Sequence, residues 1–148
     1  MNFKLYFSFL TLCFFNFNLF SQEVNYDNGW YHVTSKDSTK IWLDINDDVL
    51  IEENLITIDY VKKIEIIESE TRPFEQIEVE FNDVGKYLWE KQTEKYVNKN
   101  ICFIYNNQLI TIVKIGAIIS SGKVCICSNN SNYKLEQLFE ELKKLIKE

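Results

Sequence analysis

The chain has 148 residues, which is the size of one ordinary domain. It carries 16 Lys and Arg residues against 22 Asp and Glu residues, a formal net charge of −6, so we expect no binding of nucleic acid, which needs clustered basic side chains. The acidic residues are scattered along the chain, and their expected role is solubility.

An apolar segment follows the first four residues. It starts after Lys4, covers residues 5–20 and ends at the polar pair Ser21-Gln22. One basic residue, an apolar stretch and a polar boundary are typical of a secretory signal peptide. We therefore expect residues 1–21 to be a signal peptide and the protein to be exported, to the periplasm or the extracellular space. An uncleaved N-terminal anchor is the alternative, and no later segment is long enough for a stable membrane span.

Three cysteines follow this segment, at Cys102, Cys125 and Cys127. In an oxidising compartment, a disulfide from Cys102 to one of the other two is one interpretation, and buried thiols are the other. Cys125 and Cys127 are two residues apart on an expected strand, so they face the same side and are poorly placed to bridge each other. No second cysteine pair or nearby histidine completes a tetrahedral metal site, so we expect no metal and no cofactor.

Residues 22–75 are predicted to be a strand-rich N-terminal extension. Runs of apolar and aromatic residues predict short strands, and Asn and Asp clusters predict the turns between them. The expected elements are strands over residues 29–33, 41–45 and 49–51, a short helical turn over residues 57–61, and a strand over residues 63–69.

Residues 76–148 are predicted to form an α+β subdomain, as one compact unit with the preceding region. Ile77, Val79 and Phe81 alternate with Glu78 and Glu80, which predicts a strand whose carboxylates face solvent.

At Asn82-Asp83 the periodicity changes to that of a helix, and either side chain can cap the first turn. The expected elements are a helix to about residue 97, strands over residues 101–105, 108–113 and 124–127, and an amphipathic helix over residues 133–146. Together these elements predict an α+β fold with a mainly antiparallel sheet, two main helices packed on one face, and a ferredoxin-like tendency.

No pattern of catalytic residues is found in the sequence. His32 is the only histidine, and it lies in an aromatic strand with no nucleophile motif nearby, so a structural role is expected. The oxygen-rich segment 44–48 lacks the glycine and distal glutamate of a calcium loop, so it is interpreted as a turn. We expect no enzyme activity.

Large aromatic residues are the one indication of binding. Trp30, Tyr31, Trp42 and Trp89 are many for a small domain, and some must be core. Any of them on the outside would suit a peptide-binding surface or a sheet edge.

A spacing pattern extends from about Ile77 to the C-terminus. Its members are, in chain order, Phe81 at a strand end, Gly85, Thr93 in the helix, the turn Asn106-Asn107, and Gly122 before the last strand. This pattern resembles the head subdomain in the first periplasmic domain of the SecD/SecDF protein-translocation family. The chain departs from that family at the turn, where Asn106-Asn107 replaces Asp-Gly, and at Val113 and Ile118, which replace prolines.

The resemblance implies a fold and a class of module. The matching residues are structural, and none is catalytic in the family. In the translocation proteins this head is thought to contact the emerging polypeptide, whereas the membrane helices use the proton gradient. The resemblance therefore implies a stand-alone, exported, non-enzymatic module that binds a protein or peptide in the cell envelope. Two alternatives stay open: a small thiol-dependent enzyme, and an inhibitor or immunity-type protein with one cognate partner.

Overall fold

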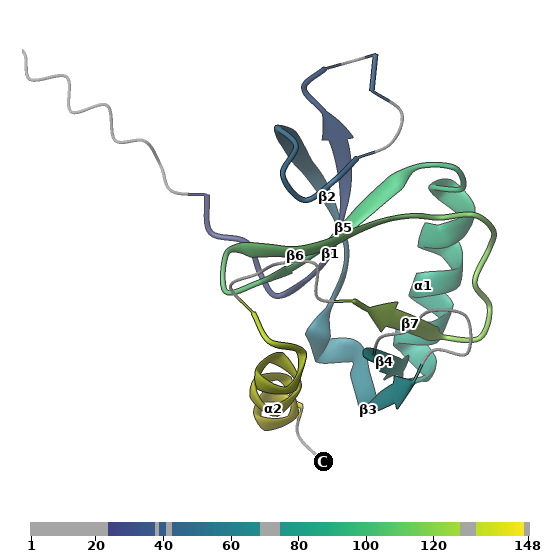
Figure 1. The fold of residues 1–148 in the computed structure, drawn as a ribbon. Helices are drawn as coiled ribbons and strands as arrows, with labels where there is room; N and C mark the ends of the chain where they lie inside the picture. The colour runs from purple at the N-terminus through teal and green to yellow at the C-terminus, as the bar shows by residue number, and fades with distance from the viewer. Residues whose placement is uncertain (1–23, 38, 41–42, 69–74, 128–132, 147–148) are drawn as a thin grey trace, which may run out of the picture.

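The computed structural model describes residues 24–37, 39–40, 43–68, 75–127 and 133–146 (Figure 1). The expected signal peptide and Trp42 lie outside these residues. The elements are β1 Gly29–Ser35, β2 Val49–Thr57, the 3₁₀ turn η1 Ile58–Tyr60, β3 Val61–Glu68, β4 Glu75–Phe81, α1 Asp83–Lys95, β5 Asn100–Tyr105, β6 Gln108–Lys114, β7 Lys123–Ile126 and α2 Leu135–Leu145.

The strands form two antiparallel sheets, with orders β2-β1-β5-β6 and β3-β4-β7. The α+β class is as the sequence predicts, and the division into two sheets is a finding of the structure. It arises because η1 changes the direction of the chain between β2 and β3. Each sheet combines strands from both sides of residue 75. Helix α1 packs on β2 and β4, one strand of each sheet, and α2 packs on β3 and β4 (Figure 1).

Two N-terminal elements differ from the sequence prediction. Leu43–Ile45 is not a strand in the structure: the segment forms a turn in which the Asp47 N–H donates to the Asp44 carbonyl at 3.0 Å. Strand β2 continues to Thr57 instead of ending near residue 51. The polar run Glu52–Asn54 interrupts the apolar pattern from which a strand is predicted. An edge strand can contain such residues, because it can leave their side chains in solvent.

Four aromatic side chains join the two sheets and α1. Trp30 of β1 lies 4.6 Å from Phe103 of β5, 5.3 Å from Phe81 of β4 and 5.9 Å from Trp89 of α1, measured between ring centroids. Phe81 and Trp89 are also in contact, at 5.5 Å. None of the four is more than 3% exposed. Edge-to-face and tilted contacts of this kind stabilise by more than the area they bury, so this cluster is the centre of the core.

The junction between β4 and α1 depends on Asn82 and Gly85. The Asn82 side chain accepts a hydrogen bond from the Gly85 N–H at 2.8 Å, which caps the first turn of the helix. A Cβ atom on Gly85 would lie 2.7 Å from the Tyr60 Cβ and 3.0 Å from the Phe81 Cβ. Glycine therefore lets α1 begin directly against η1 and the end of β4.

The other residues of the spacing pattern also have structural roles. Thr93 is fully buried; its hydroxyl donates to the Glu90 carbonyl at 3.1 Å and accepts from the Ile119 N–H at 2.9 Å, which ties α1 to the β6–β7 connection. Asn106 and Asn107 have φ values of 48° and 60°, as a tight hairpin turn requires. Gly122 has a φ of 73°, which explains the glycine before β7.

Among the described residues, none of the helices combines the length and the apolar character that crossing a bilayer requires.

Replacing Gly85 with alanine should destabilise the protein by about 1–2 kcal/mol. Alanine favours a helix by about 1 kcal/mol, but forced overpacking against Tyr60 and Phe81 should cost about 2–3 kcal/mol, the upper part of the usual range, because these Cβ atoms cannot rotate away. Gly116→Ala is the matched control, since a Cβ there meets nothing within 4 Å. Urea unfolding of both variants measures the difference, and a Gly85→Ala variant as stable as the control would contradict the close packing.

Candidate functional site

The described aromatic candidates lie inside the molecule. Trp30, Tyr31 and Trp89 are 2%, 5% and 0% exposed. Trp30 and Trp89 belong to the main core, and Tyr31 packs with Val33, Cys102 and Ile104 on the other face of the larger sheet. These three aromatics therefore do not provide an exposed binding surface.

The disulfide interpretation remains a prediction: in the structure Cys102 and Cys127 are buried and Cys125 is partly exposed. Cys102 lies on β5 in the larger sheet, whereas Cys125 lies on β7 in the smaller sheet and Cys127 follows that strand. Cys102 is buried among apolar side chains, and the Cys127 thiol donates to the Gln76 side chain at 3.4 Å. The two cysteine sites are thus built into different layers of the fold.

The environment of the cysteines does not favour thiolate chemistry. Burial raises the pKa of the Cys102 thiol to about 12. Burial, and then the charge of Glu78, also raise the pKa of Cys125. Because the thiolate is the reactive form, neither thiol has the lowered pKa that a nucleophilic cysteine needs.

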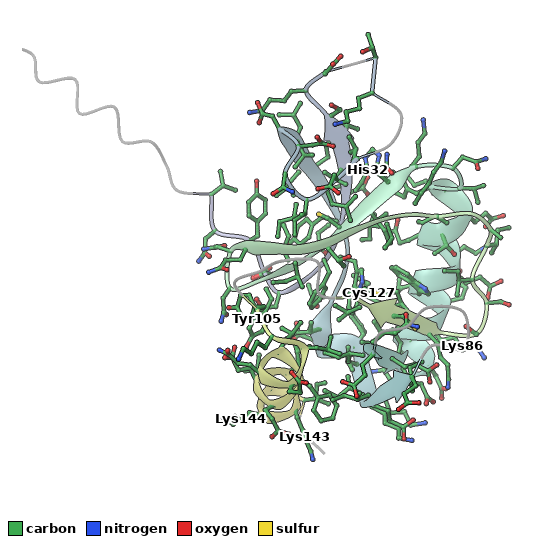
Figure 2. All side chains as sticks on the ribbon, in the orientation of Figure 1. His32, Lys86, Tyr105, Cys127, Lys143 and Lys144 are labelled. Carbon is green, nitrogen blue, oxygen red and sulfur yellow. The ribbon has the colours of Figure 1, made fainter. Side chains whose placement is uncertain are left out.

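A cleft of about 370 Å³ lies beside the C-terminal end of β1. Three segments surround it: the end of β1, the turn that follows this strand, and the connection from α1 to β5. Figure 2 shows His32 near this end of the molecule, far from Lys143 and Lys144 of α2. The lining residues are His32, Val33, Thr34, Ser35, Asp37, Lys40, Asn98, Lys99 and Asn100.

The cleft is located where β1 continues beyond its neighbour β5. The register between these strands ends at the pair Val33 and Asn100, whereas β1 stays paired with β2 up to Ser35. Figure 1 shows the ends of β1 and β2 projecting together past β5. Asn98, with a φ of 64°, turns the chain before it enters β5, and its N–H donates to the Ile115 carbonyl at 2.8 Å. The β5 side of Ser35 is therefore an open strand edge.

The main-chain groups of Ser35 point into this open edge. The Lys36 N–H donates to the Asp48 carbonyl at 3.1 Å, so the main-chain groups of Lys36 are directed toward β2. Successive residues of a strand direct their N–H and C=O groups to opposite sides. The N–H and C=O of Ser35 are consequently directed away from β2, toward the cleft.

His32 lines the cleft and is held by contacts with Glu52 and Tyr96. Its Nδ1 is 2.9 Å from Glu52 Oε2, and the other oxygen of this carboxylate accepts from the Thr34 hydroxyl at 2.7 Å. The imidazole packs on the ring of Tyr96 at 4.5 Å between centroids. The hydrogen bond from Thr34, followed by the interaction with His32, lowers the pKa of Glu52. His32 Nε2 is buried without a hydrogen-bond partner among the described residues.

A second carboxylate attaches β2 to the end of α1. Glu53 pairs with Lys95 Nζ at 2.8 Å and accepts a hydrogen bond from the Tyr96 hydroxyl. The bond to Lys95, and then that to Tyr96, lower the pKa of Glu53. Together Glu52 and Glu53 connect β2 to β1 and to the end of α1.

The charged residues of the cleft differ in how they are paired. Lys40 forms an ion pair with Asp47. The carboxylate of Asp37 accepts from the Thr39 N–H at 3.0 Å and the Thr39 hydroxyl at 2.7 Å, and these bonds lower its pKa. Lys99 is exposed, and no ion pair is recorded for it within the described ranges. Lys99 is therefore the ammonium group available to a ligand.

This arrangement provides hydrogen bonds and charge, without a reactive pair. The Ser35 hydroxyl accepts from the Asp37 N–H at 3.0 Å, and His32 Nδ1 is engaged by Glu52. Within the ranges that the structure describes, no three His, Cys, Asp or Glu side chains are grouped as metal ligands would be. A second hollow of about 170 Å³ lies between β3 and α2, lined by Lys62, Lys63, Ile64, Lys143 and Ile146. That hollow lies against β3, an edge strand of the smaller sheet, but it has less than half the volume of the cleft at β1, which we take as the candidate site.

The sequence did not indicate Ser35, Asn98 or Lys99 as site residues. The available signal was local: Asn98-Lys99-Asn100 is a turn-forming run between a helix and a strand. The length of β1 beyond β5 depends on pairing between distant strands, which local patterns do not contain.

Lowering the pH should remove the contribution of Glu52 and Glu53 to stability. Both pKa values are lowered from the ordinary 4.5 in the folded protein, so the stabilisation is present above about pH 4.5 and is lost as the pH falls through the folded values. The double variant Glu52→Gln/Glu53→Gln should therefore be less stable than the natural chain at pH 7 and match it more closely at pH 3. Urea unfolding at both pH values measures this, and an equal deficit at both would contradict it.

Cys102 should resist alkylation in the folded protein. At pH 8, iodoacetamide should leave Cys102 unmodified and label the partly exposed Cys125 slowly, because both thiol pKa values are raised. Peptide mass spectrometry measures labelling at each site, and the same reaction in urea is the control, in which both should react. Rapid labelling of Cys102 in the native state would contradict its burial.

Comparison with known proteins finds similarity in structure alone. No family model matches the sequence. No curated protein matches it either.

Two solved structures of SecDF have a similar fold. One is a crystal structure of SecDF in its super-membrane-facing form, 17% identical, with a TM-score of 0.52 over 59% of this chain and 11% of that one. The other is SecDF described as a membrane component that enhances protein export, 18% identical, with a TM-score of 0.56 over 65% of this chain and 42% of that one. The matches thus cover less than half of each SecDF chain. The protein has a SecDF-like α+β fold, as the spacing pattern of its sequence predicts.

Proposed function

We propose that this protein is an exported, non-enzymatic module that binds an extended polypeptide segment in the cell envelope. The observation that carries the proposal is the open edge of β1 at Ser35, beside the cleft. Export and the envelope location are supported by the N-terminal sequence and by the SecDF-like fold.

An open strand edge binds peptides by extending the sheet. Main-chain hydrogen bonds supply affinity, and the flanking side chains supply selectivity. Here β1 continues two residues past its last pair with β5, from Val33 to Ser35, and this overhang spans about 7 Å at the usual rise of a strand. The edge therefore recognises a short extended segment, and the structure of the rest of the partner does not matter for binding.

Side-chain interactions connect the elements beside this edge. Glu52 fixes His32 and Thr34 of β1, and Glu53 joins β2 to Lys95 and Tyr96 at the end of α1. A strand edge held in position loses little conformational entropy when a peptide binds, which favours affinity.

The similarity to SecDF supports a role in handling polypeptides. SecDF is described as a membrane component that enhances protein export. Binding of an extended chain is an activity that such a role requires, and it needs no catalytic group. The thiol-dependent alternative lacks support, because burial raises the pKa values of Cys102 and Cys125.

Peptide binding by main-chain pairing should be weakened when Ser35 is replaced by proline. Proline has no N–H to donate, yet it is accepted on an open strand edge, so the fold should remain. We expect about tenfold weaker binding, from the lost hydrogen bond and the altered edge. Fluorescence anisotropy with a library of labelled octapeptides measures the affinity, and thermal unfolding checks the fold.

Two controls separate main-chain recognition from other modes. Ser35→Ala removes only the hydroxyl and should bind as the natural chain does. Peptides N-methylated at alternate residues should bind weakly, because they lose donors along one edge. If no octapeptide binds, or if the Ser35→Pro variant and N-methylated peptides bind normally, the proposal is wrong.

A further inference from the structure

We propose that the cleft receives the C-terminal end of a polypeptide and binds its free α-carboxylate through Lys99. This inference rests on the proposed function, since it concerns the same cleft and the same edge of β1. It adds the direction of the bound chain, the group that is recognised and the residue that recognises it.

The topology of the larger sheet determines which end of a peptide reaches Lys99. Strand β5 runs antiparallel to β1 and begins at Asn100, opposite Val33. A peptide that pairs with β1 at Ser35 lies in line with β5, just before Asn100. If it is antiparallel to β1, as β5 is, its C-terminus points toward Asn100; if it is parallel, its N-terminus does.

The same topology requires the peptide to end there. The space beyond the peptide is already occupied by the protein's own chain, which passes through Asn98 and Lys99 into β5. The positive φ of Asn98 and its hydrogen bond to the Ile115 carbonyl fix this connection. A chain cannot continue straight along the β5 direction, so the cleft accommodates a terminus better than the middle of a polypeptide.

The charges of the cleft favour a carboxylate over an ammonium group. Lys99 adjoins the position of the peptide terminus, and it is the lining lysine with no ion pair recorded in the described part of the chain, whereas Lys40 is paired with Asp47. The one carboxylate that lines the cleft, Asp37, is engaged by Thr39. An incoming carboxylate would gain the attraction of Lys99, and an incoming ammonium group would be repelled by it.

The test compares octapeptides that differ only at the C-terminus. Members of the labelled library that bind the protein are synthesised as free acids and as C-terminal amides, and anisotropy measures both forms. We expect the amides to bind about threefold to tenfold more weakly, the range for an exposed ion pair strengthened by a hydrogen bond. Raising the salt concentration should reduce the difference, because exposed charges are screened.

A variant at Lys99 assigns the effect to its ammonium group. Lys99→Met keeps the aliphatic stem and should lower the affinity for the free acid to that for the amide. Lys144→Met is the matched control: Lys144 is an exposed lysine on α2, far from His32 in Figure 2, and its loss should leave the acid-to-amide difference unchanged.

The outcomes distinguish this inference from the proposed function. If acid and amide bind equally while N-methylated peptides lose affinity, edge binding stands and carboxylate recognition is wrong. If Lys99→Met leaves the acid-to-amide difference intact, Lys99 is not the recognising residue and the inference is overturned. If no peptide binds in either form, both proposals fail.

Discussion

The contact of Trp30 with Phe81, Phe103 and Trp89 is the constraint on which the rest of the structure depends. These rings come from β1, β4, β5 and α1, so a single cluster joins the two sheets and the first helix. Truncating a large buried aromatic to alanine typically costs about 3–5 kcal/mol. In a domain of this size such a loss is a large part of the total stability, so the relative position of the sheets depends on this cluster.

The position of Trp30 also sets the location of the candidate site. Trp30 lies near the start of β1 and is buried, together with Tyr31 and Val33 on either side of His32. Because this first part of β1 is fixed in the core, its last residues extend outward, past the end of β5. The open edge at Ser35 is thus the outer end of a strand whose inner end holds the sheets together. The first residues of β1 thus belong to the core, and its last residues form the open edge.

Two groups of polar residues have different roles in this protein. Asn82 and Thr93 satisfy main-chain groups, and Asn106 and Asn107 adopt left-handed turn geometry. The residues of the cleft belong to another region, where β1 and the α1–β5 connection meet. The residues that shape the β4–α1 junction and the β5–β6 turn are therefore separate from those that line the cleft.

The sequence by itself determined most of the local structure. The alternation of Ile77, Val79 and Phe81, the cap at Asn82 and the amphipathic pattern of α2 depend on neighbours within a few residues, so they could be recognised directly. The sequence pattern also indicated the SecDF-like fold. Only the tertiary structure decided the division into two sheets, the burial of Trp30, Tyr31 and Trp89, and the open edge beside Lys99. The physical reason is that these features depend on which distant strands pair and where each pairing stops, and a local pattern of side chains does not contain this information.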